Sequence, residues 1–257
     1  MGGVARGGVI GRNDRLRALP PVLACSHILV ESPRMRPLKL LFTALALAAM
    51  PAAALADSPP SDWREKVRAF NIEHCKHPAW GTSHSDRDYR LAKAMAATDK
   101  VALDDDVLFA AAYLHDVAAF KPYEKPDLDH SDVAADIVGE ILAPTGFPMA
   151  KLPKVQAAIR EHMYYRTPSV PESLYLHDAD ALDWLGAIGA ARIMALADPN
   201  GGQPDGPAVL PMLKENLRDV PARVLSPAGK ALMPAKRDLL AKWMETLSAE
   251  TDGYKTL

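Results

Sequence analysis

The sequence predicts a single all-α domain, and three observations support that fold class. Apolar residues recur at the spacing of one helix face, as in Ala134, Ile137, Val138, Ile141 and Leu142. Capping residues, prolines and glycines mark where such segments begin and end. No segment shows the strict alternation typical of a half-buried strand, and no internal repeat is visible. One helical domain is therefore the simplest interpretation of the pattern.

The first four helices are predicted from their ends. Asp62-Trp-Arg-Glu65 resembles a capping box that opens the first helix, and the second covers residues 86–98. Three aspartates at 104–106 favour the start of a third helix, because carboxylates cap free N–H groups there and complement the helix dipole. This helix is expected to run to about Phe120, and the fourth, which carries the apolar stripe, to end before Pro144.

The C-terminal half predicts three more helices. Pro153 fits the first turn of a helix that ends before Pro168. Residues 174–197 are apolar on several sides, so this helix is expected at the centre of the fold. Residues 197–208, ADPNGGQPDGPA, are rich in proline and glycine and predict a loop. A last amphipathic helix is indicated by four apolar residues: Leu240, Trp243, Met244 and Leu247.

The N-terminal part has the features of a secretory leader. Residues 35–56 combine a basic start, an apolar stretch at 40–49 and small residues at a cleavage position, Ala54 and Ala56. The apolar stretch is short for a bilayer span, and a short membrane anchor is the alternative. We expect cleavage after Ala56, a secreted or periplasmic protein, and no stable membrane span after cleavage.

Residues 1–34 are rich in glycine and arginine and have no clear periodicity. A leader is not expected so far inside a chain. We therefore expect that Met35 is the native start, and that residues 1–34 are an upstream extension foreign to the native protein.

Charge and cysteine content argue against a nucleic-acid-binding protein and against a fold held by a disulfide. The first 56 residues contain seven basic and two acidic side chains of the 30 and 32 in the chain, so the remaining 201 residues carry a net charge of −7. An acidic chain argues against binding to a nucleic-acid polymer. Cys75 is the lone cysteine of those residues, so no internal disulfide can form, and a structural role is favoured over a catalytic thiol.

His115 and Asp116 stand side by side in an apolar run, AAYLHDVAAF at 111–120. A buried carboxylate without a partner costs roughly several kcal/mol, so something must offset that cost. A divalent cation would do so, because imidazole and carboxylate are both good ligands. A buried ion pair is the alternative, and the dipeptide alone favours it. Further ligands would come from other helices, and the candidates are His84, Asp178, Asp180 and Asp183.

Three segments, in this order, resemble the HD-domain superfamily of metal-dependent phosphohydrolases, whose pattern H…HD…D is spread over several helices. They are HSDRDYRLA at 84–92, the run at 111–120, and LHDADALDWLGAIGAAR at 176–192. The last is similar to the form found in small stand-alone HD hydrolases. The resemblance covers roughly residues 62–250. It implies an all-α HD-type phosphohydrolase domain, here residues 57–257, with a metal site at the centre of the helix bundle.

The resemblance implies four metal ligands: His84, His115, Asp116 and Asp180. Of these, His115 and Asp116 are also the expected catalytic residues, with Asp116 both binding the metal and orienting the nucleophile. Asp180 is preferred over Asp178 because the final ligand of the family is the second aspartate of that run. Ligands of this kind favour Mn²⁺, Mg²⁺, Fe²⁺, Co²⁺ or Ni²⁺ as the divalent cation.

Other residues are expected around these ligands. Some members of the family use additional histidines for a second metal or for phosphate, which makes His130 and His162 candidates, with exposure to water as the alternative. Lys121 is a candidate for contact with the substrate. Asp183 is expected to hydrogen-bond within the core or to a ligand, and His177 is not expected to be a ligand. Three arginines are further candidates for phosphate contact: Arg87, Arg160 and Arg192.

The function implied by the resemblance is hydrolysis of a phosphate ester or anhydride, with nucleotides among the candidates, by attack of a metal-activated water. The partner would be a phosphorylated small molecule. Two alternatives remain at this point. One is a non-catalytic metal-binding or ligand-sensing HD module, and the other is a structural helical protein whose His-Asp pair is an ion pair of the core.

Overall fold

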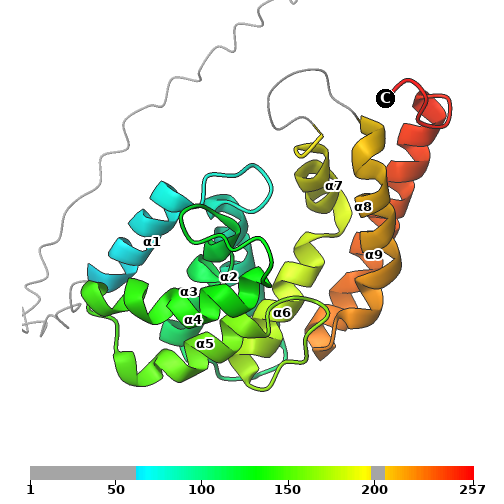
Figure 1. Cartoon of the computed structure of the whole chain (residues 1–257). Helices are drawn as coiled ribbons and strands as arrows, with labels where there is room; N and C mark the ends of the chain where they lie inside the picture. Colours follow the sequence, from blue (N-terminus) through cyan, green and yellow to red (C-terminus); the bar gives the residue numbers. More distant parts are fainter. Residues whose placement is uncertain (1–61, 198–205) are drawn as a thin grey trace, which may run out of the picture. The chain divides into compact units, whose positions relative to one another are not determined.

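The computed structural model describes residues 62–197 and 206–257, and within these ranges it contains helices and no strands (Figure 1). The predicted all-α class is confirmed. The predicted leader at 35–56 and the upstream extension at 1–34 lie outside the described residues, as do positions 198–205 of the predicted loop. Among the described helices, none is both long enough and apolar enough to cross a membrane.

The third helix lies at the centre of the N-terminal group of helices. α1 (Asp62–His74), α2 (Thr82–Thr98), α5 (Leu152–Arg160) and α6 (Pro171–Asp183) all contact α3 (Asp105–Leu114). Every residue from 107 to 114 is buried, which is expected of a helix that is apolar on all sides. Its first turn is capped as predicted, because the carboxylate of Asp104 accepts hydrogen bonds from the backbone N–H groups of Asp106 and Val107.

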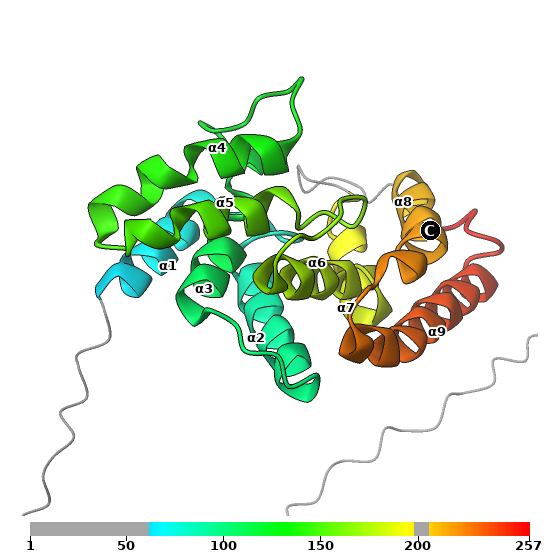
Figure 2. The ribbon, with the colours of Figure 1, turned by 90° about the horizontal axis from the view of Figure 1, so that it is seen from below.

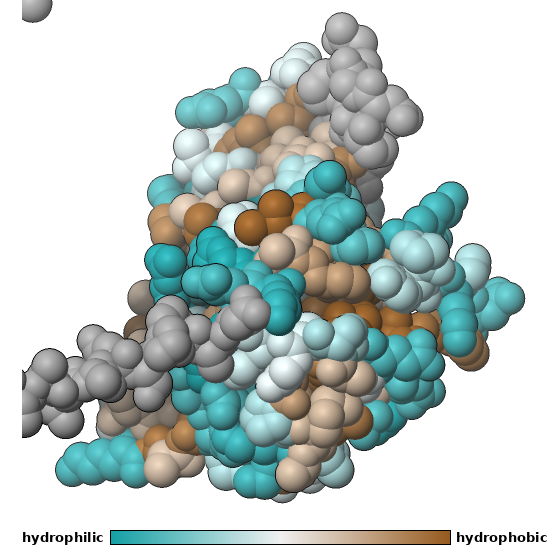
Figure 3. Space-filling view, turned by 90° about the vertical axis from the view of Figure 1, so that its left-hand side faces the viewer, coloured by the Kyte–Doolittle hydropathy of each residue, from teal (hydrophilic) through white to brown (hydrophobic). Residues whose placement is uncertain are grey.

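α4 (His130–Leu142) packs against α5 and confirms the predicted stripe. Ala134, Val138, Ile141 and Leu142 are buried. The helix continues into a short 3₁₀ turn, η2 (Ala143–Thr145), and the chain then turns at Gly146 with a φ of 97°. The face drawn in Figure 3 mixes hydrophilic and apolar residues, as is usual for a protein surface.

The helix predicted over residues 174–197 is two helices, α6 and α7 (Gly186–Met194), so the prediction of one continuous helix is wrong. The chain turns sharply at Gly186, whose φ of 70° suits a residue without a side chain. The predicted central position holds for α6, which contacts α2, α3, α5, α7 and α9. Figures 1 and 2 show α6 between the helices α1–α5 and the group α7–α9.

The C-terminal group contains one helix that the sequence analysis missed. α8 (Gly206–Asp219) begins inside the predicted loop and includes Pro211. The last helix, α9 (Pro227–Glu250), begins well before the predicted apolar residues, and the Ser226 side chain caps it by accepting from Gly229 N–H. The missed start has a simple cause, since proline and glycine at helix ends resemble those of a loop.

Two glycines of the α6–α7 turn give a prediction. Replacing Gly186 with alanine brings the new Cβ into ordinary van der Waals contact with Lys236 but strains a left-handed backbone, so we expect a loss of about 1–2 kcal/mol in the free energy of unfolding. Replacing Gly189 with alanine places a Cβ against the backbone carbonyl of Trp184, so we expect a larger loss. Urea unfolding of the two variants measures both values, and a Gly189 variant as stable as wild type would contradict the close approach.

Candidate metal centre

α2 places an imidazole and a carboxylate, those of His84 and Asp88, on the same face of the helix. This helix begins at Thr82, four residues before the predicted start, so that His84 lies in its first turn. Asp88 follows one helical turn later and therefore points the same way. His84 is 1% exposed and Asp88 is fully buried. His84 was predicted from the sequence and Asp88 was not, because the i, i+4 spacing of the two residues falls within one helix only when that helix begins at Thr82.

The end of α3 presents His115 and Asp116. The helix stops at Leu114 instead of the predicted Phe120, and the chain passes through these two residues into a short 3₁₀ helix, η1 (Val117–Ala119). His115 Nδ1 lies 2.9 Å from the carbonyl of Ala112, so Nδ1 carries the proton and donates it there. His115 Nε2 is therefore left with a lone pair.

The same arrangement recurs at two other histidines. His84 Nδ1 donates to Asp183 Oδ2 at 2.9 Å, and His162 Nδ1 donates to the carbonyl of Ile159 at 2.6 Å. A histidine whose Nδ1 proton is held in this way presents Nε2 as a ligand atom. His162 Nε2 is buried without a hydrogen-bond partner.

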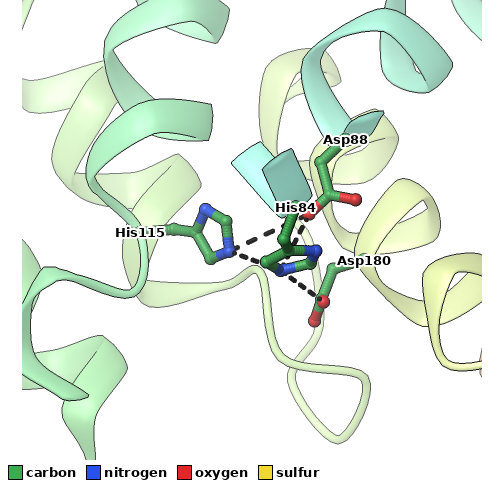
Figure 4. A group of neighbouring side chains, drawn as sticks. All are labelled: His84, Asp88, His115 and Asp180. Carbon is green, nitrogen blue, oxygen red and sulfur yellow. Dashed lines mark hydrogen bonds and ion pairs between the residues drawn. The ribbon is translucent and has the colours of Figure 1, made fainter. Parts of the chain in front are cut away.

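These lone pairs converge on one point. His84 Nε2 lies 3.2 Å from His115 Nε2, 3.1 Å from Asp88 Oδ2 and 3.3 Å from Asp180 Oδ1 (Figure 4). Asp116 Oδ2 lies 3.5 Å from the same nitrogen. Two imidazole lone pairs and several carboxylate oxygens repel one another in a dry site, unless a proton or a cation lies between them.

The four predicted ligands therefore lie together, and Asp88 joins them. Ligand atoms of His84, Asp88, His115 and Asp180 all lie within 4.8 Å of one another. His115, Asp116 and His162 form a second such group, which shares His115 with the first. That they bind metal stays a prediction.

His130 and His162 lie near the other carboxylate oxygen of Asp116, and their role in binding a second metal or phosphate stays a prediction. Asp116 Oδ1 is 3.3 Å from His130 Nε2 and 3.7 Å from His162 Nε2. Lys121 does not share this position. Its side chain is exposed, and within the described part of the chain it is not among the residues that line the pocket over the cluster.

Burial and mutual charge shift the protonation of the cluster. Burial raises the pKa of Asp88 to about 7, against the attraction of His84. Burial opposes the charged form of His84, but the nearby carboxylates, Asp88 first, raise its pKa well above the usual value. Burial also opposes the ionised form of Asp116, yet its histidine neighbours, His115 first, hold its pKa well below normal. Without a cation the cluster would keep these protons, and a bound cation would displace them.

Asp183 fixes the orientation of His84, which agrees with the expected hydrogen bond. Arg87 Nη2 and Arg192 Nη1 also contact Asp183 Oδ2, at 2.7 and 3.1 Å. These two arginines are therefore engaged by a carboxylate of the core. Arg160 lies on the surface with Asp136.

His177 is buried and pairs with Asp178, whose carboxylate accepts from the backbone N–H groups of Leu225 and Ser226. Asp178 therefore ties α6 to the start of α9, and Asp180 is the aspartate of this run that reaches the cluster. This agrees with the preference for Asp180.

A pocket of about 230 Å³ opens over the cluster. Asp116, His130 and Asp180 supply its polar part. The remaining lining is apolar and consists of Trp80, Ala119, Met163 and Trp184. The cluster is therefore reachable by a small molecule from one side.

Comparisons with known proteins bear on the domain and the fold. The family model of the HD domain matches residues 82–185. No curated protein shows significant similarity to the chain.

Solved structures share the fold. A predicted HD-superfamily hydrolase from an uncultured Thermotogales bacterium is 24% identical, with a TM-score of 0.51 over 73% of this chain and 90% of its own. Bacillus subtilis YpgQ in complex with ADP is 19% identical, with a TM-score of 0.56 over 74% and 98%. An HD-superfamily hydrolase from Bacillus thuringiensis is 21% identical, with a TM-score of 0.52 over 74% and 96%.

Metal binding should appear as thermal stabilisation. Saturation of the chelator-treated protein with Mn²⁺ at about 100 times its Kd should add about 2.7 kcal/mol, or roughly 5–10 °C in the unfolding midpoint. His84→Ala should remove most of this rise, because His84 Nε2 is central to the cluster. His74→Gln, outside the cluster, is the matched control and should keep it. An equal rise in unfolding midpoint in His84→Ala and His74→Gln would contradict binding of the cation at the cluster.

The stability of the chelator-treated protein should depend on pH, because the pKa values of the cluster residues are shifted. Asp88 has a pKa of about 7 in the folded protein and near 3.9 in the unfolded chain, so its contribution to the stability of the folded protein is lost as pH rises between these values. The raised pKa values of His84 and His115 add further losses of stability as pH rises through them. Asp116 and Asp180, whose pKa values are lowered, contribute fully throughout this range.

We therefore expect the unfolding midpoint to fall between about pH 5.5 and 8, and the rise produced by Mn²⁺ to grow over the same range because protons and cation compete. Differential scanning calorimetry at both pH values measures the two trends. A metal-free protein that gains stability toward pH 8 would contradict the protonation described here.

Proposed function

The chain carries an HD domain at residues 82–185, and on that premise we propose that it is a metal-dependent phosphohydrolase acting on a phosphate ester or anhydride. The observation that carries the proposal is the convergence of the Nε2 lone pairs of His84 and His115 with the carboxylates of Asp88, Asp116 and Asp180 in a buried site that opens to a pocket.

The donor set fits a divalent cation. Asp88 has buried oxygens without hydrogen-bond partners, and His162 Nε2 is likewise unpaired. Burying such groups without compensation is costly, and mixed imidazole and carboxylate ligands suit Mn²⁺, Mg²⁺, Fe²⁺, Co²⁺ or Ni²⁺. The residues that would hold the cation are His84, Asp88, His115, Asp116 and Asp180. When bound, a divalent cation polarises a phosphoryl oxygen and makes water a better nucleophile.

The residues at the pocket supply the rest of the chemistry. Asp116 is ionised and lies at the pocket, so its carboxylate can accept a hydrogen bond from the attacking water and orient it toward phosphorus. Burial opposes the charged form of His130, but Asp116 raises its pKa. His130 therefore keeps a proton that it can donate to a phosphoryl or leaving-group oxygen. Asp183 holds the His84 ring in place throughout.

The similar structures support the reaction class and leave the substrate open. Two of them are described as HD-superfamily hydrolases, and YpgQ was solved in complex with ADP, a phosphate anhydride. At 19% identity that likeness concerns the fold, so nucleotides remain one class to test among several phosphorylated small molecules.

Location bears on the substrate. The leader features of residues 35–56 support a proposal that the protein works outside the cytoplasm, in the periplasm or as a secreted enzyme. Substrates of the cytosolic nucleotide pool would then be out of reach, which favours a broad panel of phosphate compounds in the assay.

The proposal predicts cation-dependent phosphate release. Purified protein supplied in turn with each of the five cations should hydrolyse at least one member of a panel of phosphomonoesters, nucleotides and other anhydrides. Asp116→Ala should lower turnover at least about 100-fold while circular dichroism stays close to wild type, because the carboxylate touches the reacting groups. Cys75→Ser, a buried residue outside the described reaction, is the control and should keep turnover within about twofold.

Two outcomes would contradict the hydrolase proposal. Full activity in Asp116→Ala would remove Asp116 from the chemistry. Cation binding without turnover of any panel member would favour the alternative, an HD module that binds metal or senses a ligand without catalysis.

A further inference from the structure

The pocket over the cluster has two chemically different parts. Its polar part is formed by Asp116, His130 and Asp180, which face the phosphoryl chemistry proposed above. The other part is apolar and is dominated by two indole rings, Trp80 and Trp184, with centroids 6.3 Å apart and planes inclined at 54°. Hydrolysis of phosphate alone does not require aromatic walls, so these rings need a separate explanation.

Trp80 is held in one orientation by its neighbour. The His77 ring stacks on it at 4.0 Å between centroids, with 16° between the planes. His77 is fixed in turn, because its Nδ1 accepts hydrogen bonds from the backbone N–H groups of Ala79 and Trp80 at 3.1 and 3.4 Å. One face of the indole is thus covered, while the ring still lines the pocket.

Trp184 is fixed in a similar way. The Arg192 guanidinium lies 3.8 Å from its ring centroid, a cation–π contact. Arg192 is 3% exposed and is anchored by Asp183 Oδ2 at 3.1 Å and by the carbonyl of Ala79 at 2.5 Å. Both walls are therefore rigid before a ligand arrives, which lowers the entropy cost of binding.

The size and charge of the pocket limit the ligand. About 230 Å³ is below the roughly 300–1,000 Å³ usual for drug-sized ligands, so the group bound inside is small. Among the residues that line it there is no lysine or arginine, which gives little support to the several phosphates of a nucleoside triphosphate.

We infer that Trp80 and Trp184 are specificity-determining residues that bind a planar aromatic group, so that the preferred substrate is a small aryl phosphate monoester. The phosphoryl group would lie toward Asp116 and His130, and the aromatic ring would stack against an indole. This inference rests on the proposed function for its reaction, and on the pocket walls for its choice of substrate. The aromatic ring of a phosphorylated substrate can also be the nucleobase of a nucleotide, which the sugar joins to the phosphate, so both sources belong in the test.

Binding without turnover is the first measurement. Isothermal titration calorimetry of the full chain with excess Mg²⁺ should give a Kd for phenylphosphonate about fivefold or more below that for ethylphosphonate, since both are non-hydrolysable and differ in the ring. Trp80→Leu should remove most of this preference and Trp80→Phe should restore much of it. Trp243→Leu, a half-buried tryptophan of α9 outside the pocket, is the matched control and should retain it.

Turnover is the second measurement. The ratio of kcat/KM for phenyl phosphate to that for ethyl phosphate should exceed about five in wild type, and should fall about fivefold or more in Trp80→Leu and in Trp184→Leu. A nucleoside monophosphate tests the other source of the ring, and its kcat/KM should lie below that of phenyl phosphate. A higher value for the nucleotide would overturn the choice of a small aryl ester.

The outcomes separate this inference from the proposed function. Phenylphosphonate preference without any hydrolysis keeps the aromatic site and contradicts the hydrolase. Hydrolysis of aryl and alkyl phosphates with equal kcat/KM keeps the hydrolase and overturns the aromatic site. The same conclusion follows if Trp80→Leu and Trp80→Phe lose the aryl preference to the same extent.

Discussion

The structure brings together side chains at the cluster that repel one another, and this repulsion must be relieved. His84 Nε2 faces His115 Nε2 at 3.2 Å, and the carboxylates of Asp88 and Asp180 lie at similar distances from it. Because the Nδ1 protons of both histidines are already donated to other acceptors, neither ring can relieve the contact by changing its tautomer. The cluster must therefore hold additional protons or a cation, and the surrounding helices keep its side chains close together.

The helices meet this requirement by different means. α3 is buried on all sides and ends at Leu114, so that His115 and Asp116 follow directly after a helix held in the core. α2 supplies two groups one turn apart, and α6, packed against it, supplies Asp180 and Asp183. Asp183 also binds Arg87 and Arg192, and Arg192 supports the Trp184 wall of the pocket. One carboxylate thus connects the orientation of a ligand histidine with the shape of the substrate pocket.

Much of this architecture could be predicted from the sequence, because it is encoded locally. Helix spacing and the Asp104 cap are local signals, and the His-Asp pair in an apolar run is a local conflict that indicates a site. Features that depend on tertiary structure were missed. Asp88 was overlooked because α2 was expected to begin at Asp86, and α8 because its start resembles a loop. The break at Gly186 could not be separated from a continuous helix, since its flanks are apolar on both sides.

The central claim, that these side chains hold a divalent cation, is tested most directly by anomalous X-ray diffraction from crystals grown with Mn²⁺. The account predicts a strong anomalous peak within coordination distance of His84, His115 and Asp180, with Asp88 or Asp116 completing the ligands. Absence of a peak there at saturating Mn²⁺, or a peak confined to the surface, would contradict it and would leave the cluster as an ion-pair network held together by protons.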